Sequence, residues 1–474
     1  MAQGTHVVTG NTGVAIQAGI DQASGEGGGV VFLPARAYTL SGALKLKSNV
    51  RLVGAGASTV LQMGGSVDQA RNLNFIELEG GSTAAAHDIE ISTLTIRGPG
   101  NAANLEQDVS DTPVQGCGII AFKREVRNVV IRACHIENVS GCGISFRTPA
   151  PDQHLMEDIV IEDCRLFNNK RPGEREDDKN GPDAYKDIYF SGRAFKNIRV
   201  EGNVCSFEPN ASNAYGNDSG IAFVINGQGS EGFARNIRLV GNVCAGHRRH
   251  GLVTNYDMLK LDWAFVSDNR CQYNGWAGIY VNSHPDAAAS ARVVISGNYC
   301  QRNGFSVLGS SGDAGIKGGI VVLDAENIVL ANNICMDNGL AGPFQVENTA
   351  TSHNASGIRI RGKKAIIEGN LVQGNRGSGV SMWPGRVSEV SIVNNRAVQN
   401  KRHGIEVAGV PGGLAQQVVV TGNVCTGNTQ RGIHVSSTES GLVASNYVAN
   451  NDGGGIVVVA TATQNVQVHG NFET

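Results

Sequence analysis

The sequence predicts an all-β protein, a single parallel β-helix (solenoid) with one capping helix at its N-terminal end. Three observations lead to this prediction. A short asparagine-bounded motif recurs along the chain, a glycine-led segment with alternating side chains follows the copies, and helical periodicity is almost absent from the 474 residues. Each repeat therefore supplies short strands that stack on those of the next repeat.

The recurring motif is Asn-x-small-x-x-Asn. Its full copies are NRCQYN (269–274), NYCQRN (298–303), NICMDN (333–338), NLVQGN (370–375), NRAVQN (395–400), NVCTGN (423–428) and NYVANN (446–451). Earlier segments, at 203–208 and 242–247, keep the first half of the motif. The spacing between copies is irregular, as expected of a solenoid whose strands have fixed lengths and whose turns accept insertions.

A glycine followed by aliphatic-x-aliphatic comes after these motifs. Examples are AGIYV (277–281), SGIRI (356–360), SGVSM (378–382), HGIEV (403–407) and RGIHV (431–435). We expect glycine to permit the turn into a short strand whose side chains alternate between the interior and the exterior. Segments such as VVVTGN (418–423) precede the asparagine motif and read as further β-branched strands. Each repeat thus holds two or three strands.

One helix is expected, over VAIQAGIDQA at 14–23, with Val14, Ile16 and Ile20 on one face. Its place is the N-terminal end of the stack, where it would cover an otherwise unpaired strand edge. Residues 1–56 then form the cap and first coils, and 57–474 continue the β-helix as the same domain. No linker, charge block or change in composition marks a boundary.

The stretch that follows the helix, GGGVVFLPARAYTL…NVRLVGAG (27–56), resembles the opening of the pectate-lyase-like right-handed β-helix superfamily. The resemblance covers most of the chain at the level of repeat architecture. It implies right-handed coils and a groove along one parallel sheet that binds a polysaccharide or oligosaccharide. Members of this superfamily include polysaccharide lyases, mannuronan C-5-epimerases, glycoside hydrolases and tailspikes, which often trimerise, so a monomer or a homotrimer is expected.

Composition restricts the other partners. The formal net charge of −3 gives no overall field that attracts nucleic acid, so we expect no nucleic-acid partner. No apolar run is long enough to cross a bilayer, so no membrane partner is expected either. The expected location is extracellular or periplasmic, with a leader already removed, and a cytoplasmic location stays open.

The ten cysteines are expected to be structural. Six of them occupy the small position of the asparagine motif or its shortened form, where Val372, Ala397 and Val448 stand in other copies. A position that accepts Cys, Val or Ala is a small buried site rather than a metal ligand or half of a disulfide. The flanking asparagines are expected to form ladders in which each amide bonds to the equivalent amide one coil away.

The candidate site lies on the outward positions of the glycine-led strands. Reading every second residue places Ser145, Tyr189, Val253, Tyr280, Val321, Arg359, Ser381, Glu406 and His434 along one outward line. The expected catalytic centre is His250, Tyr280, Arg249 and Asp257, beside the segment RHGLVTNYD (249–257). Substrate is expected to contact Arg147, Tyr189, Asn255, Asn282, His284, Arg359 and Arg361.

The phrase Arg-His-Gly occurs again at 402–404. Glu406 follows this second copy, but no comparable polar surroundings are expected there, so Arg402 and His403 are interpreted as decoration. The coil at 242–257 also resembles the Arg-His-Gly coil of the mannuronan C-5-epimerase module. That family carries acidic and histidine residues where this chain has Ser145 and Arg147, which departs from the epimerase pattern.

These residue types suit cleavage of a uronate chain by β-elimination. The reaction needs a cation to neutralise the carboxylate, a base for the C5 proton and an acid for the leaving oxygen. The arginines can neutralise, His250 or ionised Tyr280 can act as base, and Tyr280 or His284 as acid. The main alternative is a glycoside hydrolase that pairs Asp257 with Asp187, Asp286 or Asp324. A C-5 epimerase and a non-catalytic glycan-binding tailspike or adhesin also stay open.

The longest charged turn is RPGEREDDKNGPD (171–183). We interpret it as a solvated loop, with a lip over the groove or a Ca²⁺ site as the sharper alternatives. Glu176, Asp177, Asp178 and Asp183 offer oxygen ligands, but their spacing is irregular. No cofactor and no resident metal are therefore expected.

Overall fold

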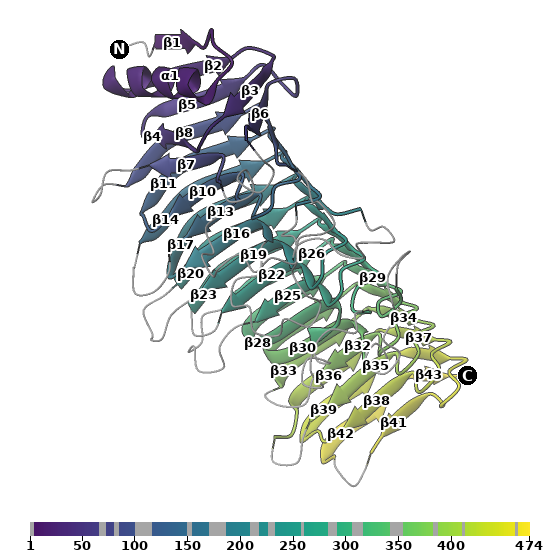
Figure 1. The fold of residues 1–474 in the computed structure, drawn as a ribbon. Helices are drawn as coiled ribbons and strands as arrows, with labels where there is room; N and C mark the ends of the chain where they lie inside the picture. The colour runs from purple at the N-terminus through teal and green to yellow at the C-terminus, as the bar shows by residue number, and fades with distance from the viewer. Residues whose placement is uncertain are drawn as a thin grey trace. The chain divides into compact units, whose positions relative to one another are not determined.

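The described part of this computed structural model is nearly all β, with parallel strands in stacked sheets and α1 (Gly13–Gly25) as its one helix (Figure 1). The structure describes residues 4–65, 73–79, 85–99, 116–148, 154–169, 186–208, 218–225, 233–256, 260–282, 292–305, 316–341, 354–382, 387–409, 413–459 and 463–474. The chain divides into two compact units, Met1–Val243 and Cys244–Thr474. The all-β prediction is confirmed, whereas the single continuous domain stays a prediction.

Each coil of the first unit supplies up to three strands, and each strand pairs in parallel with its equivalent one coil on. We name the three rows of strands by their sequence character. The glycine ladder holds β4 (Leu44–Lys47), β7 (Ile76–Glu79), β10 (Ile119–Phe122), β13 (Ile144–Arg147), β16 (Lys186–Gly192) and β19 (Ser219–Ile225). The valine ladder holds β1 (Gly4–Val7), β2 (Gly29–Leu33), β5 (Val50–Gly54), β8 (Ala86–Ser92), β11 (Val126–Arg132), β14 (Leu155–Glu162), β17 (Ala194–Glu201) and β20 (Phe233–Val240). The cysteine ladder holds β3 (Ala37–Leu40), β6 (Val60–Met63), β9 (Thr95–Arg97), β12 (His135–Glu137), β15 (Arg165–Phe167) and β18 (Val204–Ser206).

The second unit repeats the same three rows, and β21 (Val243–Ala245) lies at the boundary of the units. Its glycine ladder holds β22 (His250–Tyr256), β25 (Ala277–Asn282), the first halves of β28 (Gly318–Ala331) and β30 (Ser356–Glu368), then β32 (Val380–Met382), β35 (Ile405–Ala408), β38 (Ile433–Ser436) and β41 (Ile456–Val458). Its valine ladder holds β23 (Lys260–Ser267), β26 (Val293–Ser296), the second halves of β28 and β30, β33 (Ser388–Val393), β36 (Gln416–Thr421), β39 (Ser440–Ala444) and β42 (Asn465–His469). Its cysteine ladder holds β24 (Arg270–Gln272), β27 (Tyr299–Gln301), β29 (Ile334–Met336), β31 (Leu371–Gln373), β34 (Arg396–Val398), β37 (Val424–Thr426), β40 (Tyr447–Ala449) and β43 (Phe472–Glu473).

The capping helix α1 (Gly13–Gly25) lies against the first strands of the chain (Figure 1). Thr12 begins it, because its Oγ1 accepts a hydrogen bond from the Ala15 backbone N–H at 3.3 Å. The helix buries Ile16, Ile20 and Ala23, at spacings of four and three residues. The prediction that Val14 shares this face is wrong: Val14 is 72% exposed, since it lies two residues before Ile16 and points away from the sheet.

The asparagine and cysteine positions stack as predicted. In the second unit the motif position aligns in the order Cys271, Cys300, Cys335, Val372, Ala397, Cys425 and Val448. The flanking asparagines bond amide to amide over 2.8–3.1 Å. All ten cysteines are free and buried. Buried amides satisfied at every rung specify the register of each coil.

The glycines of the glycine ladder are required by close approach between coils, not by the expected turn. A Cβ on Gly404 would lie 2.6 Å from the Gly432 carbonyl oxygen and 2.9 Å from the Asn428 side-chain nitrogen. Gly251 is in the same position relative to Gly278 and Asn274. None of these four strand-leading glycines has a positive φ, so lack of room is the physical reason for glycine.

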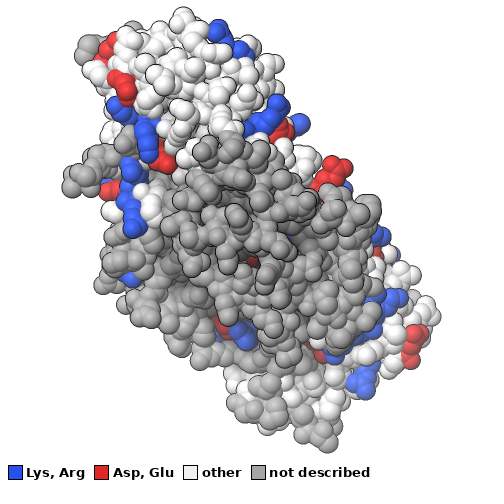
Figure 2. All heavy atoms as spheres, in the orientation of Figure 1, with Lys and Arg blue, Asp and Glu red and all other residues white. Residues whose placement is uncertain are grey.

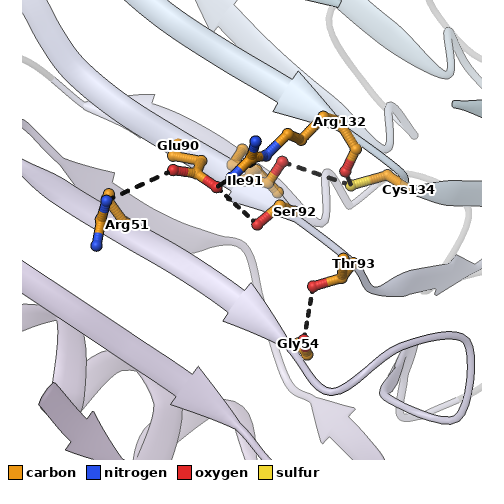
Figure 3. A network of polar contacts seen from close by, with 8 residues as sticks. All are labelled: Arg51, Gly54, Glu90, Ile91, Ser92, Thr93, Arg132 and Cys134. Carbon is orange, nitrogen blue, oxygen red and sulfur yellow. Dashed lines mark hydrogen bonds and ion pairs between the residues drawn. The ribbon is translucent and has the colours of Figure 1, made fainter. Parts of the chain in front are cut away.

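Charged side chains on the valine ladder pair across coils. Figure 3 shows Glu90 of β8 between Arg132 of β11, at 2.8 Å, and Arg51 of β5, at 3.9 Å. The buried Cys134 thiol in the same view donates to the Ile91 carbonyl oxygen. Where described residues are in view in Figure 2, basic and acidic side chains lie next to one another. Among the described helices, none is long and apolar enough to span a membrane.

Candidate functional site

The outward line expected on the glycine ladder has the predicted register. In the second unit, backbone pairing aligns Val253, Tyr280, Val321, Arg359, Ser381, Glu406 and His434. In the first unit, Ser145 pairs with Tyr189 and Arg147 with Ser191. No one-residue slip inverts either list, because aliphatic residues such as Ile279 and Ile320 fill the interior positions.

The outward line is not an open, solvent-exposed face. Tyr189 is 1% exposed, Arg147 5% and Tyr280 8%. In the first unit the Arg147 guanidinium lies 5.1 Å from the centre of the Tyr189 ring, and Lys186 lies over the same ring at 4.7 Å. Lys186 also forms an ion pair with Asp218 at 3.4 Å. The structure thus brings Arg147 and Tyr189 together, and their role in binding substrate stays a prediction.

The first Arg-His-Gly copy builds a compact aromatic cluster in the second unit. The His250 ring stacks on the Tyr280 ring, with centroids 4.7 Å apart and planes 9° from parallel. Trp276 meets the edge of His250 at 5.3 Å, and the Arg249 guanidinium lies 4.7 Å from the centre of the Trp276 ring. The structure therefore joins three of the four expected catalytic residues, Arg249, His250 and Tyr280.

A backbone hydrogen bond orients His250. Its Nδ1 accepts the Ala277 N–H at 3.3 Å, so the neutral imidazole carries its proton on Nε2. In this form Nε2 is a hydrogen-bond donor. Sequence reasoning missed Trp276, and the signal for it was the segment GWAGIYV (275–281), where tryptophan comes just before a strand-leading glycine.

The remaining expected residues divide into three groups. Asp257 and His284 lie outside the described residues, and only the backbone of Asn255 is described, paired with Asn282. Arg361 forms an ion pair with Asp324. Arg359 donates through Nη2 to the Asn354 carbonyl oxygen and, at 3.4 Å, to the Ser356 hydroxyl. Of the residues proposed for a hydrolase, Asp286 is outside the described residues, and so is the 171–183 turn.

The second Arg-His-Gly copy repeats the geometry of the first. His403 Nδ1 accepts the Arg431 N–H at 3.3 Å, as His250 does from the residue equivalent to it. The His403 ring stacks on His434 with centroids 4.6 Å apart, as His250 stacks on Tyr280. One arrangement therefore occurs twice, with a different outward ring.

The expectation that this second copy lacks polar surroundings is wrong. Glu406 Oε2 accepts hydrogen bonds from Ser378 at 2.7 Å and from Ser381 at 3.4 Å. Arg402 contacts Glu406 Oε1 at 3.4 Å and the Asn354 side-chain oxygen at 3.2 Å. These partners were missed because they come from neighbouring coils that are far away in the sequence.

Burial and charge keep the two histidines of this cluster neutral. Burial lowers the pKa of His403 to about 4, and Arg402 and Arg431 act in the same direction. Burial also lowers the pKa of His434, and that of Arg359 to about 10. Burial tends to raise the pKa of Glu406, but Arg402 and the Ser378 hydrogen bond outweigh it and keep that pKa below its usual value. Glu406 is therefore ionised at neutral pH.

His403, Glu406 and His434 each offer a ligand atom within 4.8 Å of the others, a set that can bind a metal ion. The details fit a cation poorly. The Nδ1 lone pair of His403 already accepts the Arg431 N–H, and Glu406 is paired with Arg402. Arg359, Arg402 and Arg431 all lie close enough to influence the pKa values of this cluster. Three guanidinium groups repel a metal ion more than one carboxylate attracts it.

A family model described as rhamnogalacturonase A/epimerase, pectate lyase-like matches residues 8–246, just over half of the chain. The chain belongs to this pectate-lyase-like family. A second model, described as a right handed beta helix region, matches residues 341–472 of the pectate-lyase-like chain. The predicted resemblance to the right-handed β-helix superfamily is confirmed.

Individual relatives of this pectate-lyase-like chain are similar over short segments or at low identity. Alginate lyase 7 of Azotobacter vinelandii is 42% identical over 103 residues, which are 20% of this chain and 11% of the relative's length. The A-module of a mannuronan C-5 epimerase of the same organism covers 98% of this chain and 95% of its own, at 19% identity and a TM-score of 0.44. The similarity to the catalytic unit of an α-1,3-glucanase from Streptomyces thermodiastaticus covers 100% of this chain and 71% of the glucanase chain, at 14% identity and a TM-score of 0.49.

Proposed function

We propose that the protein is a carbohydrate-active enzyme that cleaves a uronate-containing polysaccharide by β-elimination, with its centre at Arg249, His250 and Tyr280. The observation that carries this proposal is the stacked pair of His250 and Tyr280 on neighbouring coils, with Arg249 next to His250 in the chain. A proton donor, a phenol and a cation are then available within one cluster. Arg249 can neutralise the carboxylate, and Tyr280 can act first as base and then as acid, which are the roles that the elimination requires.

The hydrogen bond to His250 supports the following roles. Because His250 Nδ1 accepts a backbone N–H, its Nε2–H donates to the substrate carboxylate together with Arg249. Tyr280, as phenolate, takes the C5 proton. The C5–H electron pair becomes the C4–C5 double bond, the bond from C4 to the glycosidic oxygen breaks, and the Tyr280 hydroxyl returns the proton to that oxygen. The products are one unsaturated chain end and one new reducing end.

A matching segment of a relative supports the choice of substrate class. The 103 residues that are 42% identical to alginate lyase 7 make alginate the first substrate to test. We propose an extracellular or periplasmic protein that acts as a monomer or homotrimer on such a chain. The arginines supply the positive charge, so the proposed reaction proceeds without a cofactor or resident metal, and activity should survive a chelator.

The experiment is a substrate panel of alginate, pectate, glucuronan and neutral glycans. Ultraviolet absorbance reports the unsaturated product, and a reducing-end assay reports any cleavage. We expect both signals from a uronate polymer, and Tyr280→Phe and His250→Ala should each lower the rate about 10²–10⁴-fold. Tyr299→Phe is the matched control, because Tyr299 lies on β27 of the cysteine ladder and not beside His250.

The alternatives give different results. Exchange of the C5 proton for solvent deuterium without cleavage would identify an epimerase, which shares the first step. New reducing ends without an unsaturated product, abolished by Asp257→Asn and little changed by Tyr280→Phe, would identify a hydrolase. Retention of glycan with neither signal would identify a binding protein.

A further inference from the structure

A polar pocket of about 430 Å³ lies beside the second Arg-His-Gly copy, in the second unit. Its lining residues are His403, Thr429, Gln430, Arg431, Asp452 and Gly453. Thr429, Gln430 and Asp452 are exposed, and Arg431 is half-buried. A guanidinium, a carboxylate, an amide and a hydroxyl thus surround one hollow. This mixture of donors and acceptors matches the hydroxyl and carboxylate groups of an acidic sugar.

Three guanidinium groups, those of Arg359, Arg402 and Arg431, lie in or beside the pocket, against the two carboxylates of Glu406 and Asp452. The carboxylate of Glu406, next to the pocket, is held by Arg402 at 3.4 Å and by two serine hydroxyls. Among the described residues, no side chain forms a hydrogen bond or ion pair with the Arg431 guanidinium. Arg431 therefore faces the pocket as a half-buried cation to which no counter-charge is bonded within the described ranges, and such a group attracts an anion.

The tautomer of His403 strengthens the preference of the pocket for an anion. His403 lines the pocket as a neutral ring with its proton on Nε2, because the Arg431 N–H occupies Nδ1. A neutral Nε2–H donates a hydrogen bond to an oxygen ligand and offers no lone pair to a metal ion. The pocket therefore differs from the metal site that two histidines and a glutamate would otherwise indicate.

We propose that this pocket is a second glycan subsite, in which Arg431 and His403 bind the carboxylate of a uronate residue. Asp452, Gln430 and Thr429 then hold its hydroxyl groups. The ligand class, a uronate oligosaccharide, rests on the proposed function. Glu406 is four rungs from Tyr280 along the glycine ladder, roughly 19 Å at about 4.8 Å per rung. The subsite is thus separate from the His250 cluster, and a long chain can occupy both.

The test is calorimetric titration of the full chain with alginate oligosaccharides of increasing length and with a neutral oligosaccharide of the same length. The replacement Arg431→Gln should weaken binding of the long uronate oligomer about 10-fold, the effect of losing one charge-assisted hydrogen-bond pair. Arg396→Gln is the matched control. Arg396 is exposed on β34 of the cysteine ladder, outside the pocket lining, and its replacement should leave affinity unchanged.

The outcomes separate this subsite from the proposed function. Uronate binding that depends on Arg431, in a protein that produces no unsaturated product from any glycan, supports the subsite and refutes the lyase. Elimination activity with equal uronate affinity in wild type and Arg431→Gln refutes the subsite and leaves the lyase intact. Tight binding of Zn²⁺ that is lost in His403→Gln, or absence of any uronate binding, would also overturn the subsite.

Discussion

His250 and His403 have one geometry on different coils. In both, Nδ1 accepts the backbone N–H of the residue before the next strand-leading glycine, and the ring stacks on the outward side chain of that next strand. The backbone thus fixes the ring orientation and the tautomer. The outward residue, Tyr280 or His434, determines what chemistry the pair can perform.

Replacing His403 should alter the pH dependence of stability. Its pKa is about 4 in the folded protein and about 6.5 when unfolded, so the unfolded chain binds the extra proton first. This stabilisation is complete above about pH 6.5 and is lost as the pH falls toward 4. His403→Gln should therefore lose less free energy of unfolding on mild acidification than the wild type, as measured by urea denaturation.

The charged groups around His403 set the pH range of that experiment. Glu406 has a lowered pKa, so its own contribution is lost only at more acidic pH, while Arg402 and Arg431 stay charged throughout. His434 also has a lowered pKa and titrates in the same direction as His403. The variant should therefore keep part of the pH dependence. An unchanged slope in His403→Gln would contradict the assignment of a neutral, buried His403.

At the scale of the element, the asparagine ladders tie each coil to the next. Asn338 donates to the Asn375 side-chain oxygen at 2.8 Å and to the Cys300 carbonyl oxygen at 3.2 Å, and it accepts from Asn303 at 3.0 and 3.1 Å. Asn338→Ala should lower the free energy of unfolding by about 2–4 kcal/mol, because several buried groups lose their partner. Chemical denaturation measures this change.

The last rung is the control for that replacement. Asn471 is half-buried at the end of its ladder, where solvent can replace the missing amide. Asn471→Ala should therefore have a smaller effect than Asn338→Ala. Equal losses of unfolding free energy at the two positions would show that the asparagines contribute through packing along the β-helix and not through satisfied buried amides.

The strands could be predicted from the sequence because their alternation and their motifs are local. The register from Val253 to His434 followed from glycine and aliphatic spacing alone. The second site could not be predicted in this way. Arg402 meets Asn354 across 48 positions of sequence, and the length of the intervening turns sets which residues meet. Burial of outward residues such as Tyr189 also depends on tertiary contacts that no periodicity encodes.

At the scale of the molecule, the cysteines should behave as interior residues. All ten are free and buried, so a reagent in solution does not reach them in the folded protein, and burial also raises the pKa of the Cys425 thiol to about 12. A thiol reagent should label the native protein slowly and the unfolded protein rapidly. Rapid native labelling of Cys271 or Cys300, or their recovery as a disulfide, would contradict a stacked thiol interior.

Thermal unfolding tests the predicted domain organisation. If residues 57–474 continue the cap as one domain, calorimetry should show one cooperative transition, because each coil is stabilised mainly by its neighbours. Two independent transitions that match separately produced fragments 1–243 and 244–474 would contradict that prediction and indicate separate folding units.

The repeated arrangement, a histidine oriented by a backbone N–H and stacked on the next outward side chain, has an evolutionary consequence. Because His250 and His403 are each oriented by main-chain atoms, the supporting framework is indifferent to which ring lies beneath the imidazole. A single codon change at that outward position therefore exchanges one reactive pair for another and leaves the interior untouched. New specificities can arise in such a protein by substitution on a single coil. Protein engineers can use the same backbone arrangement to introduce a chosen pair of a histidine and an outward side chain.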